Sequence, residues 1–395
     1  MKIMNNFYHS LMNNNIDNDD IKHLITFLKS TKKFTNGPKV KEFEYKWSKW
    51  LGVKYSVFVN SGSSANLISI AALKILKGTG EIIVPPLTWS SDIYAVIHNG
   101  FKPKFIDINL KNLAIDEDKL EKAINKNTKA LFLTHVLGFN GLSNKILSIL
   151  KKRNIELIED CCESHGAQFL KKKIGTFGSQ SNFSFYYAHH MSTIEGGMVC
   201  TNDFQTYETL RMLRSHGMVR EASSIYTKKK FIKKYPKLNK EFIFAYPAYN
   251  VRSTEINACL GISQLKKLDQ NNKLRFENFK FFLANLDKKK FYTDFEIEGS
   301  VNYALIILIN KKYIKPNTDY KIKSILKKNK IEFRQGLSGG GNQMQQPYLR
   351  NIIKKINNNN FKNIEYIHRY GYYIGNYPSL KRGRIKKICD ILNRI

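Results

Sequence analysis

The chain has 395 residues, of which 42% are hydrophobic and 12% aromatic, so it can bury a large core and extensive disorder is not expected. No apolar run reaches the roughly 18 residues of a membrane span, and the first residues form no apolar signal core, which argues against membrane insertion and secretion. The formal net charge of +33 is dispersed and no nucleic-acid-binding motif accompanies it, so we interpret it as solvated lysine that also attracts anionic substrates.

Short β-rich runs alternate with helical patterns in the first half of the chain. The patterns predict strands over residues 55–59, 81–84, 105–108, 130–134 and 155–159, and helices over 64–75, 116–124 and 144–152. Such alternation is typical of a mostly parallel sheet covered by helices. Ligands of these sheets collect at the carboxyl ends of the strands.

The second half of the chain is predicted to begin with a polar segment that leaves the first domain as a loop or hairpin. Residues 221–240 are polar, basic and irregular, which indicates a loop or hairpin, and a long helix from Ser253 to about Phe282 follows. Strands around 303–309 and a final helical region complete the pattern, with a flexible turn at 338–341 and a low-complexity loop at 357–360. We therefore expect a large cofactor-binding domain, residues 1–245, and a small α/β domain, residues 246–395.

A glycine motif lies between the first predicted strand and its helix. Its residues are Asn60, Ser61, Gly62, Ser63 and Ser64. Glycine lets a backbone approach an anion closely, and a helix amino terminus offers free N–H groups and a favourable dipole. The motif therefore predicts a phosphate site, although serine is also a preferred helix cap and a plain capping turn is the alternative.

Two carboxylates, Glu159 and Asp160, end the strand predicted over 155–159. A carboxylate in this position can keep a pyridine nitrogen protonated, because the ion pair favours the charged form of the ring. An aspartate that caps a helix is the alternative.

Two adjacent histidines, His189 and His190, follow an aromatic run and precede Glu195-Gly196-Gly197. A single histidine is more often structural than catalytic, but this setting favours a functional one. Since neighbouring side chains diverge, we expect only one of the pair to face a site.

In this order the motifs resemble those of the DegT/DnrJ/EryC1/StrS family of nucleotide-sugar enzymes, over nearly the whole chain. The resemblance also includes Pro85-x-x-Thr88-Trp89, Glu159-Asp160-x-x-Glu163, and Tyr249-Asn250-x-Arg252. It implies the type I fold of pyridoxal-phosphate-dependent transferases: α/β, with a large, mostly parallel seven-stranded sheet domain and a smaller carboxyl-terminal α/β domain.

The resemblance also implies roles for individual residues. Asp160 would pair with the cofactor ring nitrogen, Glu163 would lie near the phenolic oxygen, and Trp89 would stack on the ring. The phosphate would bind Gly62, Ser63 and Ser184, with Asn250 arriving from the second subunit of a homodimer that shares its active sites. His216 and Arg220 would contact substrate, although a capped helix end explains them nearly as well.

The chain departs from the family at one position. Most members have a cofactor-binding lysine six residues before the acid that precedes Gly-Gly, and counting back from Glu195 leads to His189. Histidine cannot hold the cofactor covalently as lysine does, but it can move a proton near neutral pH. The substitution resembles the branch of pyridoxamine-phosphate-dependent 3-dehydratases that act on nucleotide-linked 4-keto-6-deoxy sugars, and this implies a catalytic His189.

This branch implies a cofactor that cycles between pyridoxal and pyridoxamine 5′-phosphate, with L-glutamate as amino donor. The five scattered cysteines indicate a reducing cytoplasm and offer no metal or iron–sulfur framework. A related enzyme of CDP-sugars has such a cluster, so the lack of clustered cysteines favours a GDP-sugar. The resemblance to the dehydratase branch implies a 3,6-dideoxy-4-keto product for a surface polysaccharide. We expect no nucleic-acid or membrane partner.

Two alternatives come from the same sequence. The first is an aminotransferase that makes a 4-amino sugar, against which the missing lysine argues. The second is a basic nucleic-acid-binding or regulatory protein on a disused enzyme scaffold, against which the ordered cofactor motifs argue.

Overall fold

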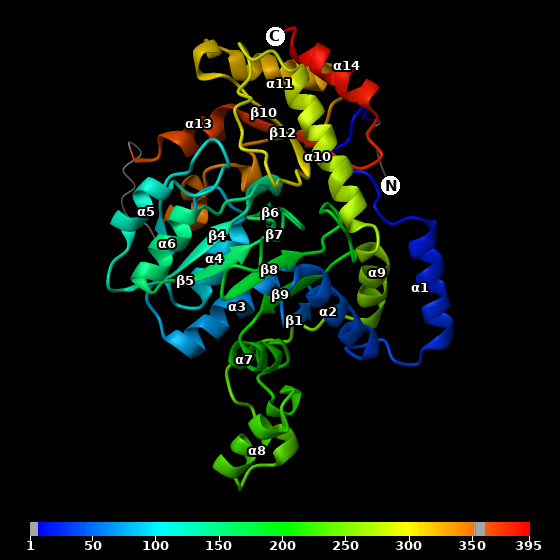
Figure 1. Ribbon diagram of the computed structural model, residues 1–395, viewed down its shortest axis with the longest axis vertical. Coiled ribbons are helices and arrows are strands. Elements are labelled where there is room, and N and C mark those ends of the chain that lie inside the picture. The colour runs from blue at the N-terminus through cyan, green and yellow to red at the C-terminus, as the bar shows by residue number, and fades with distance from the viewer. Residues whose placement is uncertain (1–6, 351, 353–359) are drawn as a thin grey trace.

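The computed structural model of the protein describes residues 7–350, 352 and 360–395 (Figure 1). A seven-stranded sheet forms its centre, with the order β1-β9-β8-β5-β4-β2-β3. The strands are β1 (Tyr55–Val59), β2 (Glu81–Val84), β3 (Lys102–Phe105), β4 (Thr128–Thr134), β5 (Glu156–Asp160), β8 (Gln180–Ser184) and β9 (Gly197–Thr201). Only β9 runs antiparallel to its two neighbours, so the predicted, mostly parallel sheet is confirmed.

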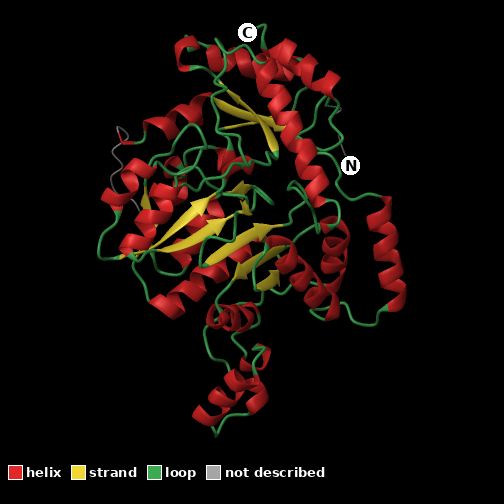
Figure 2. Ribbon diagram, in the orientation of Figure 1, coloured by secondary structure: helices red, strands yellow, loops and turns green. Residues whose placement is uncertain are grey.

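Helices cover both faces of this sheet (Figure 2). Along β4, Leu131 and Leu133 pack into one core, while Ala130 and Phe132 pack into another on the opposite face. This alternation follows from the twofold repeat of a strand and explains why the parallel strands are apolar throughout. The helices are α2 (Pro38–Leu51), α3 (Gly62–Lys77), α4 (Ser90–His98), α5 (Glu117–Ala123), α6 (Asn144–Arg153) and α7 (Phe204–Arg214).

One predicted strand is displaced. The strand expected over 105–108 runs instead from Lys102 to Phe105, at the edge of the sheet, where Pro103 costs no ladder hydrogen bond. Beyond it, Asp107 turns away to accept hydrogen bonds from the backbone N–H groups of Asn363 and Ile364. The apolar pattern continued past the point at which the strand ends.

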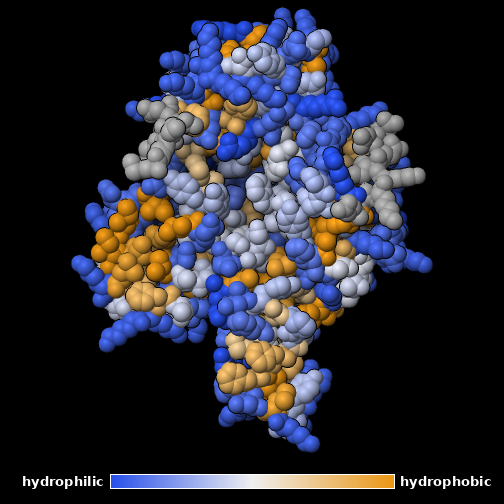
Figure 3. Space-filling model, turned by 180° about the vertical axis from the view of Figure 1, so that it is seen from behind, coloured by the Kyte–Doolittle hydropathy of each residue, from blue (hydrophilic) through white to orange (hydrophobic). Residues whose placement is uncertain are grey.

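The excursion at 221–240 contains a helix that the sequence did not predict. Helix α8 (Ile225–Lys234) begins after Ser224, whose hydroxyl accepts hydrogen bonds from the N–H groups of Tyr226 and Thr227. No residue of α8 is buried, and its apolar side chains stay at least partly exposed. Residues 222–246, here called the arm, protrude from the body of the molecule (Figures 1 and 3).

The long helix expected from Ser253 to Phe282 is two helices, α9 (Glu255–Leu265) and α10 (Leu268–Asn285). Helix α9 packs against α1 (Asn18–Ser30) and α2, while α10 continues toward a second sheet. A domain division at residues 245/246 stays a prediction.

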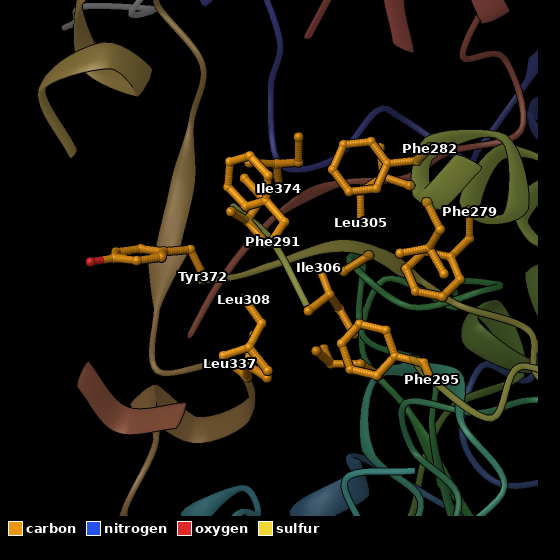
Figure 4. Packing of buried hydrophobic residues seen from close by; sticks show 14 of the residues in the cluster. Phe279, Phe282, Phe291, Phe295, Leu305, Ile306, Leu308, Leu337, Tyr372 and Ile374 are labelled. Atoms are coloured by element: carbon orange, nitrogen blue, oxygen red, sulfur yellow. The ribbon is translucent and has the colours of Figure 1, made fainter. Parts of the chain in front are cut away.

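The second sheet is antiparallel, with the order β10-β12-β11. Its strands are β10 (Ala304–Leu308), β11 (Phe333–Gln335) and β12 (Gly371–Gly375), and its helices are α11 (Thr318–Lys328), α12 (Pro347–Arg350), α13 (Lys362–Tyr370) and α14 (Arg382–Leu392). Phe279 and Phe282 of α10 pack on Leu305 and Ile306 of β10, so α10 shares the core of this sheet (Figure 4).

Two short strands, β6 (Gln168–Phe169) and β7 (Lys172–Lys173), form a separate hairpin. Residues 357–359 of the predicted asparagine-rich loop lie outside the described part. Among the described helices, none combines the length and apolar character needed to cross a membrane.

Candidate active site

A cavity of about 390 Å³ lies at the carboxyl ends of β4, β5 and β8, where ligands of such sheets bind. Thr134, Asp160 and Ser184 are the last residues of these strands and all line it. The cavity brings together most of the predicted site residues: Gly62, Ser63, Trp89, Asp160, Glu163, Ser184 and His189.

The amino terminus of α3 forms one end of the cavity. Ser61 caps the helix by accepting a hydrogen bond from the N–H of Ser64, while the N–H groups of Gly62 and Ser63 belong to the first turn, which lacks helical carbonyl partners. A Cβ atom on Gly62 would lie 2.5 Å from Cβ of Ser184, so only glycine fits there. This end of the cavity suits an anion.

Asp160 and Trp89 offer a carboxylate and an aromatic face. Asp160 is almost fully buried, and its Oδ1 accepts a 2.8 Å hydrogen bond from the N–H of Cys162. Trp89 precedes α4 and is 57% exposed, so its indole is free to cover a flat ligand. The pair suits a flat heterocycle with a protonated nitrogen.

His189 and His190 point to different places. His189 lines the cavity, and its backbone carbonyl accepts a hydrogen bond from the side-chain amide of Asn15. Burial lowers the pKa of His189 to about 4, although the negative charge of Asp160 acts to raise it. The imidazole of His189 is therefore neutral at neutral pH. His190 is buried away from the cavity and hydrogen bonds to the carbonyl of Val301.

Glu163 is held by groups from two distant segments. Its Oε2 accepts a hydrogen bond from the N–H of Leu137, and its Oε1 accepts one from the hydroxyl of Ser338, both at 2.8 Å. Burial outweighs these hydrogen bonds and raises the pKa of Glu163 to about 7. The segment 338–341, predicted to be a flexible turn, is therefore tied to the site through Ser338.

Several further lining residues were not predicted as site residues. Five of them come from distant parts of the chain: Leu11 and Met12 from the first described segment, Tyr303 from the residue before β10, and Arg334 and Tyr373 from the second sheet. Arg334 is the one lysine or arginine among the described lining residues. No local motif marks these positions, because only the packing of the second sheet over the first brings them to the cavity.

Three predicted residues lie elsewhere. His216 and Arg220 line a second, larger cleft of about 930 Å³ at the base of the arm, together with Lys41, Arg211, Lys228 and Arg252. Asn250 is exposed beside Ser215, with which it forms an isolated β-bridge. Within one chain, these three residues do not join the cavity.

A buried cluster of His135, Glu159 and Cys161 has the spacing of metal ligands, but hydrogen bonds account for it. Nδ1 of His135 accepts the N–H of Gly141, which leaves a proton on Nε2 to donate to Glu159 at 3.3 Å. Glu159 also accepts three backbone N–H groups of the segment Gly175–Gly178. We interpret this cluster as a support for β5.

The model of the DegT/DnrJ/EryC1/StrS aminotransferase family matches residues 14–393. The chain belongs to this family. The resemblance predicted from the sequence motifs and the α/β fold that it implied are both confirmed.

Several proteins that are similar to this chain have names that describe an activity. The chain is 34% identical over 375 residues to GDP-4-keto-6-deoxy-D-mannose 3-dehydratase of Escherichia coli O55:H7, covering 91% of this chain and 93% of that protein. It resembles the crystal structure of GDP-4-keto-6-deoxymannose-3-dehydratase with a trapped PLP-glutamate geminal diamine, with 32% identity, a TM-score of 0.89 and coverage of 97% and 100%. A mutant of that enzyme with bound GDP-perosamine is 31% identical, with a TM-score of 0.87 and the same coverage.

Proposed function

We propose that the chain is a pyridoxamine/pyridoxal 5′-phosphate-dependent 3-dehydratase of a nucleotide-linked 4-keto-6-deoxy sugar, with GDP-4-keto-6-deoxy-D-mannose as substrate. Its main support is His189, which lines the cavity at the position where most members of the family have lysine. The names of full-length relatives support the same reaction and the GDP-sugar. The product would be a 3,6-dideoxy-4-keto sugar for a surface polysaccharide such as an O-antigen containing colitose.

The cavity fits the cofactor that the resemblance implies. The amino terminus of α3 suits its phosphate because Gly62 leaves no side chain between the helix and Ser184. Asp160 would pair with the ring nitrogen and Trp89 would cover the ring. Glu163 would meet the phenolic oxygen. When bound, the cofactor supplies an amine that condenses with the sugar ketone and a ring that accepts electrons.

His189 would move the proton of the reaction. A neutral imidazole with a pKa of about 4 is free to accept a proton at neutral pH. His189 would take the proton from the carbon between the cofactor ring and its nitrogen, then donate it to the C3 hydroxyl as that group leaves as water. Hydrolysis would release the 3-deoxy-4-keto sugar and the nitrogen of the cofactor as ammonia. Glutamate would therefore have to restore the amine after each turnover, its carboxylate held by Arg334.

The nucleotide would bind the basic cleft at the base of the arm, through His216 and Arg220 among other groups, while its sugar enters the cavity of the second subunit of a dimer. We infer a homodimer, because the arm exposes large apolar side chains that a second copy can cover (Figure 3). In that dimer the exposed Asn250 would reach the partner's cofactor. The five cysteines are all free thiols, which supports a cytoplasmic location.

The test is to incubate the protein with GDP-4-keto-6-deoxymannose, glutamate and pyridoxal phosphate. We expect release of ammonia and 2-oxoglutarate with a nucleotide sugar that has lost water, identified by mass spectrometry. Accumulation of a stable 4-amino sugar would assign the chain to the aminotransferases instead. A parallel panel of CDP- and dTDP-sugars tests the choice of nucleotide.

A further inference from the structure

Asp92, in the first turn of α4, lies directly behind the cavity and is fully buried. Its Oδ2 lies 2.5 Å from the hydroxyl of Thr88 and 2.8 Å from that of Thr134, and the two hydroxyls are 2.7 Å apart. Its Oδ1 accepts a 2.7 Å hydrogen bond from the side-chain amide of Asn66. Asp92 is not part of the motifs on which the proposed function rests.

The carboxyl group of Asp160 also lies within hydrogen-bonding range of Asp92. Thr134 brings the two acids together, because it contacts Asp92 and is the register partner of Asp160 in the β4–β5 pair. Two carboxylates this close, one of them fully buried, cannot both be ionised without a large electrostatic cost.

The oxygen contacts give a proton count. Each threonine hydroxyl can donate its single proton to Oδ2 of Asp92, which accounts for the short distances among these three oxygens. Both hydroxyl protons are then used, so the contact between the carboxyl groups of Asp92 and Asp160 requires a third proton. Asp160 accepts the N–H of Cys162 and lines the cavity, whereas Asp92 is fully enclosed by protein, so we assign this proton to Asp92.

We propose that Asp92 is held as a neutral carboxylic acid that shares its proton with Asp160, so that the pair carries one negative charge, directed at the cavity. Asp92 is thus a positioning residue for the carboxylate that would face the ring nitrogen. Burial and the neighbouring charge of Asp160 raise the pKa of Asp92 well above its usual range, which agrees with this assignment. The consequence for the ring nitrogen rests on the proposed function, whereas the protonation of Asp92 does not.

Two titratable groups beside the pair stay neutral near neutral pH. Cys162 lies next to Asp160, and Tyr348 of α12 interacts with Asp92. Burial raises the pKa of both groups, so neither the thiol nor the phenol carries a charge there.

Glu163 and His189 interact with Asp160 from the cavity side. The imidazole of His189 is neutral at neutral pH, so it does not stabilise a second negative charge on the pair. Any charge on Glu163 is negative, which adds to the cost of ionising both aspartates.

Infrared spectroscopy of the protein without cofactor tests the protonation directly. With aspartate side-chain carboxyls labelled with ¹³C, we expect the carbonyl band of a protonated acid at pH 7, and we expect Asp92→Asn to remove it. The matched control is Asp107→Asn, since Asp107 is equally buried in the same domain but accepts two backbone N–H groups and faces the ammonium of Lys119. This control should keep the band. Absence of the acid band from the wild-type protein would overturn the assignment, and this measurement does not depend on the folding of any variant. A band that persists in Asp92→Asn would overturn it as well.

A second measurement tests the functional consequence in the loaded protein. The ¹⁵N chemical shift of a labelled cofactor ring reports the pKa of its nitrogen as pH is varied. Since Asn replaces a neutral acid, we expect Asp92→Asn to change this pKa by less than about half a unit. A fall of about one unit or more would mean that Asp92 is a second anion. Failure of the protein to bind the cofactor would contradict the proposed function and leave the infrared result standing.

Discussion

His189 and His190 are neighbours in the chain, yet the structure gives them separate surroundings. His189 lines the cavity, while His190 is buried and bonded to the carbonyl of Val301. The proposed reaction therefore assigns the proton transfer to His189 and a packing role to His190.

Replacing His189 with lysine should restore a covalent bond to pyridoxal phosphate and remove the neutral base. We expect visible absorbance that survives gel filtration, and a dehydration rate lower by about 10²–10⁴-fold, the usual contribution of a general base. His190→Asn is the matched variant and should show neither effect. Unchanged dehydration in His189→Lys, with a loss in His190→Asn, would mean that the wrong histidine was chosen.

Glu163 should make stability depend on pH, with a definite sign. Its folded pKa of about 7 lies above the ordinary value of 4.5, so the folded state holds a proton that the unfolded state has already released between these values. The free energy of unfolding should therefore fall as pH rises from 4.5 to 7, by roughly 3 kcal/mol from this group alone.

Glu163→Gln should lack this contribution. We expect its stability relative to wild type, measured by urea unfolding without cofactor, to rise by roughly 3 kcal/mol between pH 4.5 and pH 8. Glu298→Gln, at an exposed position, serves as the control and should show no such trend. A difference between Glu163→Gln and wild type that is the same at both pH values would contradict the raised pKa.

At the scale of elements, the junction of β1, α3 and β8 sets the shape of the anion site. A methyl group on Gly62 would meet Ser184, so either α3 or β8 must shift. We expect Gly62→Ala to weaken cofactor binding at least about tenfold and to cost about 1–3 kcal/mol of stability, as overpacking does. Equilibrium dialysis and urea unfolding measure the two effects. Gly383→Ala in α14, where a Cβ meets nothing within 4 Å, should leave cofactor binding intact.

The sequence predicted the elements that carry strong periodicity and missed those without it. β1 and β2 run over the predicted residues because turn residues bound their apolar runs on both sides. The sequence pattern did not reveal α8, none of whose residues is buried. It also did not reveal the break between α9 and α10, because residues that favour helices continue through Lys266 and Lys267.

The same limit applies to the site. Gly62, Asp160 and His189 stand in local motifs at the ends of strands, where sequence reasoning could find them. Tyr303 and Ser338 reach the cavity only because the second sheet folds over the first, which no local pattern records. Asp92 has no motif either, since its environment is made by residues from three separate segments.

At the scale of the whole molecule, the arm makes a prediction about assembly. Ile225 and Tyr226 are 70% and 77% exposed, which is unfavourable for side chains of this size unless a partner covers them. The double variant Ile225→Lys, Tyr226→Lys should sediment as a monomer and lose activity, because Asn250 would no longer reach a partner's site. Tyr320→Lys, equally exposed on α11, should stay dimeric and active. A double variant that remains dimeric would place the interface elsewhere.

The first described residues are fastened to the last strand of the fold. His9 hydrogen bonds to the carbonyl of Gly375, and Leu11, two residues on, lines the cavity. During synthesis, the ribosome therefore releases Asp160 and His189 long before the cavity wall that includes Leu11 and Tyr373 can close. A nascent chain would expose an unfinished site until β12 emerges. Stable capture of the cofactor then becomes an event of the finished polypeptide, and ribosome-stalled chains that end before β12 should not retain it.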